Sequence, residues 1–233
     1  SNRPALKRIA ITGDRIRPAP DPDHRTMRFL LAAITVTIVA LARPLWGERE
    51  EASFTQVREV LVALDLSRSM LTEDVEPSRL ELAKSITGEL LDALQGESVG
   101  LIVFAGTAFV QVPLSPDYQI IREFLPNLDS GYLPQGGSNY TSMLEAALDG
   151  FSDAEDRDRF LIVLSDGESS TGGWQARLDE LVDRGVHVLA FGVGTDGGGF
   201  IADPLLGGYL AGSDGNPIQS RLMPATLQTL ASR

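Results

Sequence analysis

Three oxygen-bearing side chains follow a run of apolar residues at positions 60–64. Asp65, Ser67 and Ser69 occupy alternate positions directly after this run. If the run forms a buried strand, its end presents one carboxylate and two hydroxyls together. Carboxylate and hydroxyl oxygens are hard donors, which Mg²⁺, Mn²⁺ and Ca²⁺ prefer. The stretch therefore predicts part of a divalent-cation site, to which other segments must add ligands.

A second acid and a glycine-rich loop are candidates for the missing ligands. Asp166 ends another apolar run, 160–165, and the loop 134–141 places two glycines directly before Ser138. In open α/β sheets, ligands bind outside the carboxyl ends of the strands. If the strands concerned are neighbours, we expect Asp166 and Ser138 to lie beside Asp65.

Two hydroxyls in the glycine-rich loop, Ser138 and Thr141, are alternatives for the third-loop ligand. Ser142-x-x-Glu145 has the pattern of a capping box, which marks a helix start and places Thr141 at that start. We favour Ser138 for this reason. The predicted metal ligands are Asp65, Ser67, Ser69, Ser138 and Asp166. Glu168 is predicted to lie on the solvated rim, because most acidic side chains are exposed.

The predicted donor set does not saturate the coordination shell of a divalent ion, so an open coordination position should remain for water or for a carboxylate of another molecule. Mg²⁺ is the expected ion, with Mn²⁺ and Ca²⁺ as alternatives. The chain has no cysteine, which excludes a thiolate site, and only two histidines, His24 and His187. Zinc chemistry and most histidine-based acid/base catalysis are therefore disfavoured.

The elements that would position these residues follow an α/β pattern. Continuous apolar runs, typical of strands covered on both faces, alternate with amphipathic segments typical of helices. The runs at 98–105 and 108–114 are separated by only two residues, too few for a parallel crossover, so they should form an antiparallel hairpin with an edge strand. The predicted fold is a Rossmann-like, doubly wound, mostly parallel sheet. The predicted strands are 58–64, 98–105, 108–114, 159–165 and 186–193.

The N-terminal part differs from the rest. Residues 1–28 form a basic polar linker with seven basic and three acidic residues, a net charge of +4. Because the whole chain has a net charge of −12, residues 29–233 carry −16. The apolar stretch 29–47 is predicted to be a transmembrane helix; a signal peptide and a buried core helix are the alternatives. The basic side precedes the span, so the positive-inside rule places the acidic domain outside the cytoplasm.

The motifs Asp65-x-Ser67-x-Ser69, Gly-Gly-Ser138 and Leu-Ser-Asp166-Gly resemble, in this order, the metal-ion-dependent adhesion site (MIDAS) of von Willebrand factor type A (VWA) domains. The resemblance covers residues 56–233. The family usually has Thr where this chain has Ser138, which keeps the hydroxyl. The resemblance implies a VWA fold, Mg²⁺, and protein binding without catalysis.

Several further segments resemble the bacterial BatA/BatB membrane subfamily, an aerotolerance-type group. They are 42–47, 64–70, 103–106 and a Gly-rich region, 194–221, in which we expect a small hairpin insertion. This likeness implies a MoxR-type AAA+ ATPase and other Bat proteins as partners. We expect a single span in the bacterial inner membrane, and the charge bias places the VWA domain on the periplasmic side, whereas a cytoplasmic ATPase partner would favour contact inside.

Two other functions compete with a binding module that captures a partner's carboxylate. One is a metal-dependent phosphoester hydrolase, which lacks support because Ser67, not an acid, stands two residues after Asp65. The other is a structural domain with a vestigial metal site. The acidic charge disfavours nucleic-acid binding, and the glycines at 192–197 match a dinucleotide fingerprint without the helix that it requires. We therefore predict no enzyme activity.

Overall fold

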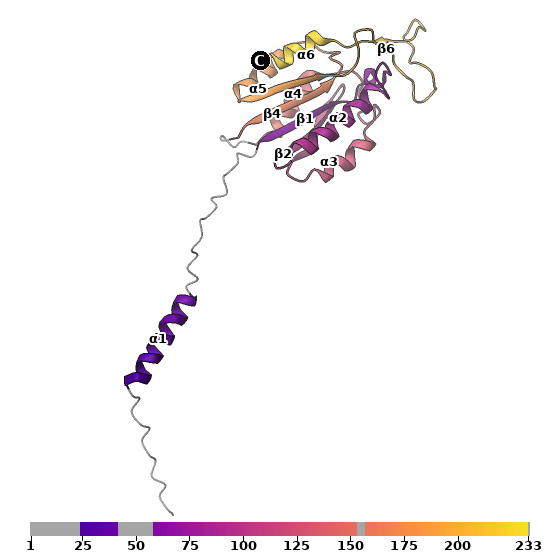
Figure 1. Cartoon of the computed structure of the whole chain (residues 1–233). Coiled ribbons are helices and arrows are strands. Elements are labelled where there is room, and N and C mark those ends of the chain that lie inside the picture. The colour runs from indigo at the N-terminus through magenta and orange to yellow at the C-terminus, as the bar shows by residue number, and fades with distance from the viewer. Residues whose placement is uncertain (1–23, 42–57, 153–156, 233) are drawn as a thin grey trace, which may run out of the picture. The chain divides into compact units, whose positions relative to one another are not determined.

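The computed structural model describes residues 24–41, 58–152 and 157–232. The chain divides into two units, Ser1–Ser53 and Phe54–Arg233, which are treated separately. In the first unit, the described residues form one helix, α1 (His24–Leu41). In the second, helices cover both faces of a central sheet (Figure 1).

The sheet has five strands in the order β3-β2-β1-β4-β5. Strand β1 lies at its centre and pairs in parallel with β2 and β4, and β4 pairs in parallel with β5. Within this sheet, only β2 and β3 pair antiparallel, and β3 lies at one edge. The predicted fold class, a mostly parallel sheet with one antiparallel edge strand, is confirmed. The strands are β1 (Glu59–Asp65), β2 (Ser98–Phe104), β3 (Ala108–Ser115), β4 (Arg159–Ser165) and β5 (Val186–Gly192).

The core has two layers because side chains alternate along each strand. On β1, Val60, Val62 and Leu64 pack into one apolar cluster with residues of α2 and α3. Leu61 and Ala63 pack into the other, with residues of α4, α5 and α6. Every residue of β1 is buried, so its end is fixed from both sides. The helices are α2 (Arg79–Ala93), α3 (Gln119–Phe124), α4 (Tyr140–Gly150), α5 (Gln175–Asp183) and α6 (Pro224–Ala231), with short 3₁₀ turns η1 (Arg68–Leu71) and η2 (Leu125–Asn127).

The Gly-rich segment between β5 and α6 forms a small two-stranded sheet of β6 (Gly199–Phe200) and β7 (Gln219–Ser220), paired antiparallel. Further antiparallel bridges join Ala202 to Tyr209 and Ala211 to Pro217. Another bridge joins Ile201 to Thr72, just after η1. The segment therefore folds back over the residues that follow β1, at the end of the sheet where β1 and β4 finish (Figure 1).

The predicted membrane span over 29–47 does not appear as such. Helix α1 starts at His24 and includes Arg25 and Arg28, so its uncharged part, 29–41, extends for only about 20 Å. That is less than the roughly 30 Å hydrocarbon core of a bilayer. None of the helices in the described ranges has the length and hydropathy that a membrane crossing requires. Residues 42–47 of the prediction lie outside the described residues.

Candidate metal site

The carboxylate of Asp65 is fixed at the end of β1 by two hydrogen bonds. The Ser67 N–H donates to its Oδ1 at 2.9 Å, and the Ser165 Oγ–H donates to its Oδ2 at 2.6 Å. The first bond closes a turn that ends the strand, after which η1 begins at Arg68. Asp65 is 0% exposed. Its carboxylate is thus held in one orientation and removed from bulk water.

The two predicted hydroxyl ligands lie side by side. The Oγ atoms of Ser67 and Ser69 are 3.0 Å apart, and both residues are buried. The Ser67 N–H donates to Asp65, and the interaction of Ser69 with Asp166 acts to lower the pKa of that carboxyl. The alternate spacing in the sequence therefore brings both hydroxyls between the two acids.

Asp166 follows the last residue of β4, next to β1, and its side chain is also fully buried. Its Oδ1 accepts from the Glu168 N–H at 3.0 Å, and its Oδ2 from Arg79 Nη1 at 3.0 Å. Burial raises the pKa of Asp65, and the neighbouring charge of Asp166 raises it further. Burial also raises the pKa of Asp166, while its bond to Ser69 opposes that rise. At Asp166, burial therefore outweighs the positive charge of Arg79, and at Asp65 burial and the charge of Asp166 outweigh the hydrogen bonds from serines.

Ser138 is buried, and its backbone exchanges hydrogen bonds with Ser170. The Ser138 N–H donates to Ser170 Oγ at 3.1 Å, and the Ser170 N–H donates to the Ser138 carbonyl at 3.0 Å. A cavity of about 210 Å³ lies where the loops after β1 and β4 meet the glycine-rich loop. Its lining includes Ser67, Ser69, Gly137, Ser138 and Glu168. Thr141 is not among the described lining residues.

The predicted capping box at Ser142-x-x-Glu145 is wrong. The N-cap of α4 is Asn139, whose side chain accepts from the Ser142 N–H at 3.2 Å. The helix therefore starts three residues earlier than that pattern indicates, because Asn is as strong an N-cap as Ser. Thr141 becomes the second residue of α4, and Ser138 remains in the loop.

Arg79 is a contributor that the sequence did not indicate. Its side chain is 0% exposed although it opens α2. It donates to Asp166, to both oxygens of Asp74 at 2.8 Å, and to Ser220 Oγ at 2.7 Å. Gly194, at φ +132°, leaves space for it, since a Cβ there would lie 2.6 Å from Arg79 Nε. An arginine in a helix start gives no sign in sequence that it will be buried.

Ser165 and Tyr140 form a second supporting group. Because Ser165 Oγ donates to Asp65, the Tyr140 hydroxyl is the donor in its 2.8 Å bond to Ser165. The Gly167 N–H also donates to Ser165 Oγ, at 3.1 Å. Ser165 precedes Asp166 in the Leu-Ser-Asp motif, and that position was the available signal.

Glu168 lies at the rim of the cavity, as predicted. Its Oε1 accepts from Ser220 Oγ at 2.9 Å and from the Arg221 N–H at 3.1 Å. The acid therefore ties the cavity to strand β7 of the Gly-rich segment.

The residues present fit a hard divalent cation. Two buried carboxylates face each other across hydroxyls, and among the described residues only one of the two, Asp166, contacts a cation, Arg79. Within the described ranges, no group of three or more His, Cys, Asp or Glu side chains is placed to hold a metal ion. The donors beside the two carboxylates are hydroxyls, and hard oxygen donors of this kind suit Mg²⁺.

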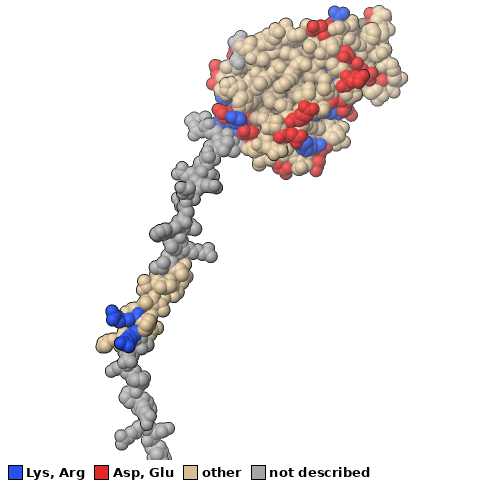
Figure 2. Space-filling view, viewed as in Figure 1, with Lys and Arg blue, Asp and Glu red and all other residues tan. Residues whose placement is uncertain are grey.

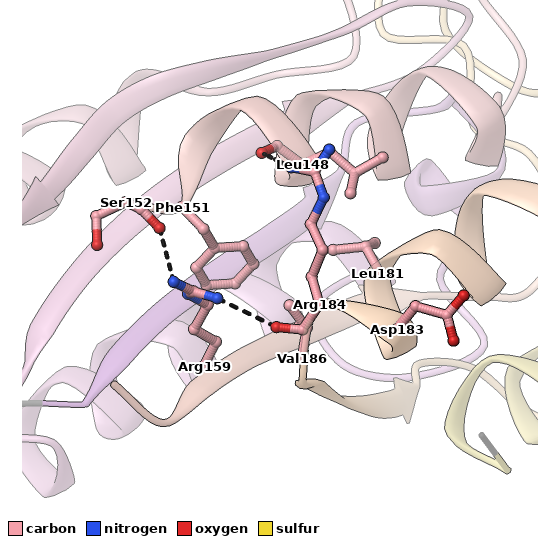
Figure 3. Close-up of a pocket in the computed structure, with 8 residues that line it drawn as sticks. All are labelled: Leu148, Phe151, Ser152, Arg159, Leu181, Asp183, Arg184 and Val186. Carbon is pink, nitrogen blue, oxygen red and sulfur yellow. Dashed lines mark hydrogen bonds between the residues drawn. The ribbon is translucent and has the colours of Figure 1, made fainter. Parts of the chain in front are cut away.

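A larger cavity, of about 550 Å³, lies at the opposite end of the sheet. Its lining includes Phe151, Arg159 and Arg184 (Figure 3). Figure 3 shows the Arg159 guanidinium between the carbonyls of Ser152 and Arg184, to which it donates at 2.8 and 3.1 Å. Backbone carbonyls thus accept hydrogen bonds from the Arg159 guanidinium, and none of the predicted metal ligands lines this cavity.

Residues 60–168 match the family model of the von Willebrand factor type A domain. An aerotolerance-related membrane protein from Bacteroides fragilis is 35% identical, with a TM-score of 0.72 over 75% of this chain and 87% of that one. BatB from Bacteroides thetaiotaomicron is 36% identical, with a TM-score of 0.72 over 75% of this chain and 85% of that one. The chain belongs to the VWA family. The predicted likeness to the bacterial BatA/BatB-type subfamily is also confirmed.

A UPF0353 protein of Mycolicibacterium paratuberculosis is 27% identical over 188 residues, which are 75% of this chain and 56% of that protein. The chain spans about half the length, or less, of the curated relatives it matches. At the level of the fold, the mussel byssus proximal thread matrix protein 1 is similar, with 19% identity and a TM-score of 0.55. Its structure is described as having a zinc-occupied MIDAS motif.

Proposed function

We propose that this domain is a metal-dependent protein-interaction module. Asp65, Ser67, Ser69, Ser138 and Asp166 hold one Mg²⁺ ion, with Mn²⁺ or Ca²⁺ as alternatives, and a carboxylate of a partner protein completes its shell. The metal supplies positive charge to the acid pair and a ligand position to the partner. No catalysis is assigned to it.

The observation that carries this proposal is the pair of buried acids. Asp65 and Asp166 are both 0% exposed, and the charge of Asp166 raises the pKa of Asp65, which hydroxyls rather than cations surround. Burying two like charges is costly unless a cation compensates them. A divalent ion removes that cost, and the partner's carboxylate then makes a charge-assisted contact in a partly desolvated site.

Calorimetric titration of the chain with MgCl₂ or MnCl₂ tests the metal. We expect one site per chain, and its loss in Asp65→Asn, which keeps the shape of the side chain but removes its charge. Circular dichroism should show that the fold of the variant persists. An unchanged titration in Asp65→Asn would rule out this site.

Affinity capture with and without Mg²⁺ tests the partner. We expect bound proteins to be released by EDTA and to be absent when Asp65→Asn is the bait. Retention of the same proteins in EDTA would contradict a role for the metal in binding. Capture of a MoxR-type AAA+ ATPase or of other Bat proteins would extend the proposal to the system that the subfamily resemblance implies.

We further propose that the chain is attached to the bacterial inner membrane, with the VWA domain on the extracytoplasmic side. The support is that the Bacteroides fragilis relative is an aerotolerance-related membrane protein and that the apolar sequence of 29–47 follows a basic segment. Protease added to intact spheroplasts should digest the domain. A domain degraded only after lysis would place it in the cytoplasm.

A further inference from the structure

Two leucines of the Gly-rich segment are exposed beside the metal cavity. Leu205 is 91% exposed and Leu206 89%, the largest values among the big apolar side chains described. They line a groove of about 580 Å³, together with Leu71, Pro204 and Leu210. Exposed apolar side chains gathered at a groove mark binding surfaces more often than scattered ones do.

The backbone holds these leucines in place. Asp203 Oδ1 accepts from the N–H groups of Leu205 and Leu206 at 2.9 and 3.1 Å, and the Gly207 N–H donates to the Asp203 carbonyl at 3.0 Å. Gly207 and Gly208 follow at φ +73° and +79°, which close the turn. The two side chains are thus presented outward by a hydrogen-bonded turn.

The groove and the metal cavity share a wall. Arg68, between the ligand candidates Ser67 and Ser69, lines both of them. Its side chain is exposed, and over the described ranges it forms no ion pair. Figure 2 shows acidic side chains spread over the visible face of this domain with few basic ones among them. A cation left unpaired in such a domain is complementary to an anionic group of a partner.

We infer that the groove binds apolar side chains of the same partner segment whose carboxylate reaches the metal. The partner is then a protein segment in which an acidic residue is followed directly by apolar residues. The acid completes the metal shell beside Arg68, and the apolar side chains cover Leu71, Leu205 and Leu206. This inference rests on the proposed function, because the metal fixes where the acid lies.

A protein segment suits the groove better than a lipid surface does. Asp129 and Asp203 also line the groove, and the chain has a net charge of −12. Anionic headgroups repel such a surface, whereas a peptide can place its apolar side chains between the two acids.

Fluorescence anisotropy with labelled peptides tests the inference on the full chain. The peptides are Gly-Ser-Asp-Leu-Leu-Ser-Gly, its Asp-Ser-Ser counterpart and its Asn-Leu-Leu counterpart, each in MgCl₂ and in EDTA. We expect the Asp-Leu-Leu peptide to bind at least about tenfold more tightly than Asp-Ser-Ser in Mg²⁺. Asn-Leu-Leu should lose the Mg²⁺ dependence.

The double variant Leu205→Ser/Leu206→Ser should abolish the preference for Asp-Leu-Leu and leave the MgCl₂ titration unchanged. Ile120→Ser is the matched control, since Ile120 is 43% exposed on α3, which contributes nothing to the groove, and should keep the preference. Equal Mg²⁺-dependent affinity for both Asp peptides would overturn the inference and leave the proposed function standing. No Mg²⁺-dependent binding of any peptide would overturn both.

Two further measurements test whether lipid or a second copy of the chain binds the groove instead. If the leucines instead bind lipid, phosphatidylcholine vesicles will sediment the parent chain and not the double variant, while peptide affinities stay equal. If they bind a second copy of the chain, sedimentation velocity will show a dimer that the double variant loses. Either result overturns the inference.

Discussion

Strand β1 carries a buried acid at each end, and the two are treated differently by their surroundings. Glu59, at its start, is 1% exposed and lies 3.1 Å from Arg157 Nη1 and 3.7 Å from Arg159 Nε. It also accepts from the N–H and the hydroxyl of Ser152. Asp65, at the other end, is 0% exposed and faces a second acid across hydroxyls.

The presence or absence of a neighbouring cation separates Glu59, a structural acid, from Asp65, a candidate binding acid. The charge of Glu59 is compensated within the protein, so that end of the strand needs nothing from outside. The charge of Asp65 has no such partner among the described residues, and we propose that a metal ion compensates it. Burial alone therefore does not indicate function, whereas buried negative charge without a matching positive charge does.

The largest expected effect comes from Arg79, the cation that contacts Asp166. In Arg79→Met, Asp74 and Asp166 lose a buried partner, so the free energy of unfolding without metal should fall by about 3–5 kcal/mol. Urea denaturation in EDTA measures this loss. Saturating Mg²⁺ should restore part of it, since the metal replaces the positive charge near Asp166.

Arg177→Met is the matched control, because Arg177 makes only exposed ion pairs, with Glu145 and Glu180. It should leave stability nearly unchanged. If Arg79→Met were as stable as the parent chain, the buried charge of Asp166 would not need compensation by Arg79. The contrast between the compensated charge of Glu59 and the uncompensated charge of Asp65 would then weaken.

Neutralising the two acids of β1 should change stability in opposite directions. Glu59→Gln weakens charge-assisted bonds to Arg157 and Ser152, so the free energy of unfolding should fall by about 2 kcal/mol. Asp65→Asn removes one of two repelling charges, so metal-free stability should stay equal or rise. Urea denaturation of both variants in EDTA makes the comparison. A loss of stability in both would show that Asp65 is also compensated internally.

Acid should remove the contribution of Asp74. Burial alone would raise its pKa, but the bonds from Arg79 and Thr195 outweigh burial and lower the pKa to about 2, from 3.8 ordinarily. Since the folded-state pKa is depressed, the stabilisation is fully present above the ordinary pKa and is lost as the pH falls from about 4 towards 2. The loss should be roughly 2 kcal/mol.

Urea midpoints measured across this pH range test the expectation. Asp74→Asn should flatten the pH dependence, while Asp149→Asn, on the exposed surface of α4, should not. A parent chain whose midpoint is constant between these pH values would contradict the role of Asp74.

The smallest expected effect distinguishes the two hydroxyls of the third loop. Ser138→Ala removes a predicted ligand and should weaken Mg²⁺ binding by about tenfold. Thr141→Ala, inside α4, should change it by less than about twofold. Calorimetric titration measures both variants. The reverse order of effects would transfer the ligand position to Thr141.

The fold was predictable because it depends on local patterns. Apolar runs gave the five strands, and the two-residue link at 106–107 required an antiparallel edge pair, since a parallel crossover needs more chain. The start of α4 was missed because Asn139 and Ser142 are both good N-caps, and only the hydrogen bond to the Ser142 N–H shows which one acts. The predicted span over 29–47 stays a prediction, because residues 42–47 lie outside the described ranges.

The sequence by itself determined the chemistry of the candidate site. Asp65, Ser67 and Ser69 at alternate positions, with Asp166 after a second apolar run, specify hard oxygen donors at strand ends whatever the rest of the chain does. Only the tertiary structure decided how their charge is balanced. Arg79 reaches Asp166 from 87 positions away, and Leu205 and Leu206 lie beside Arg68 because the Gly-rich segment folds back over η1. Such contacts depend on packing between distant segments, which spacing along the chain does not encode.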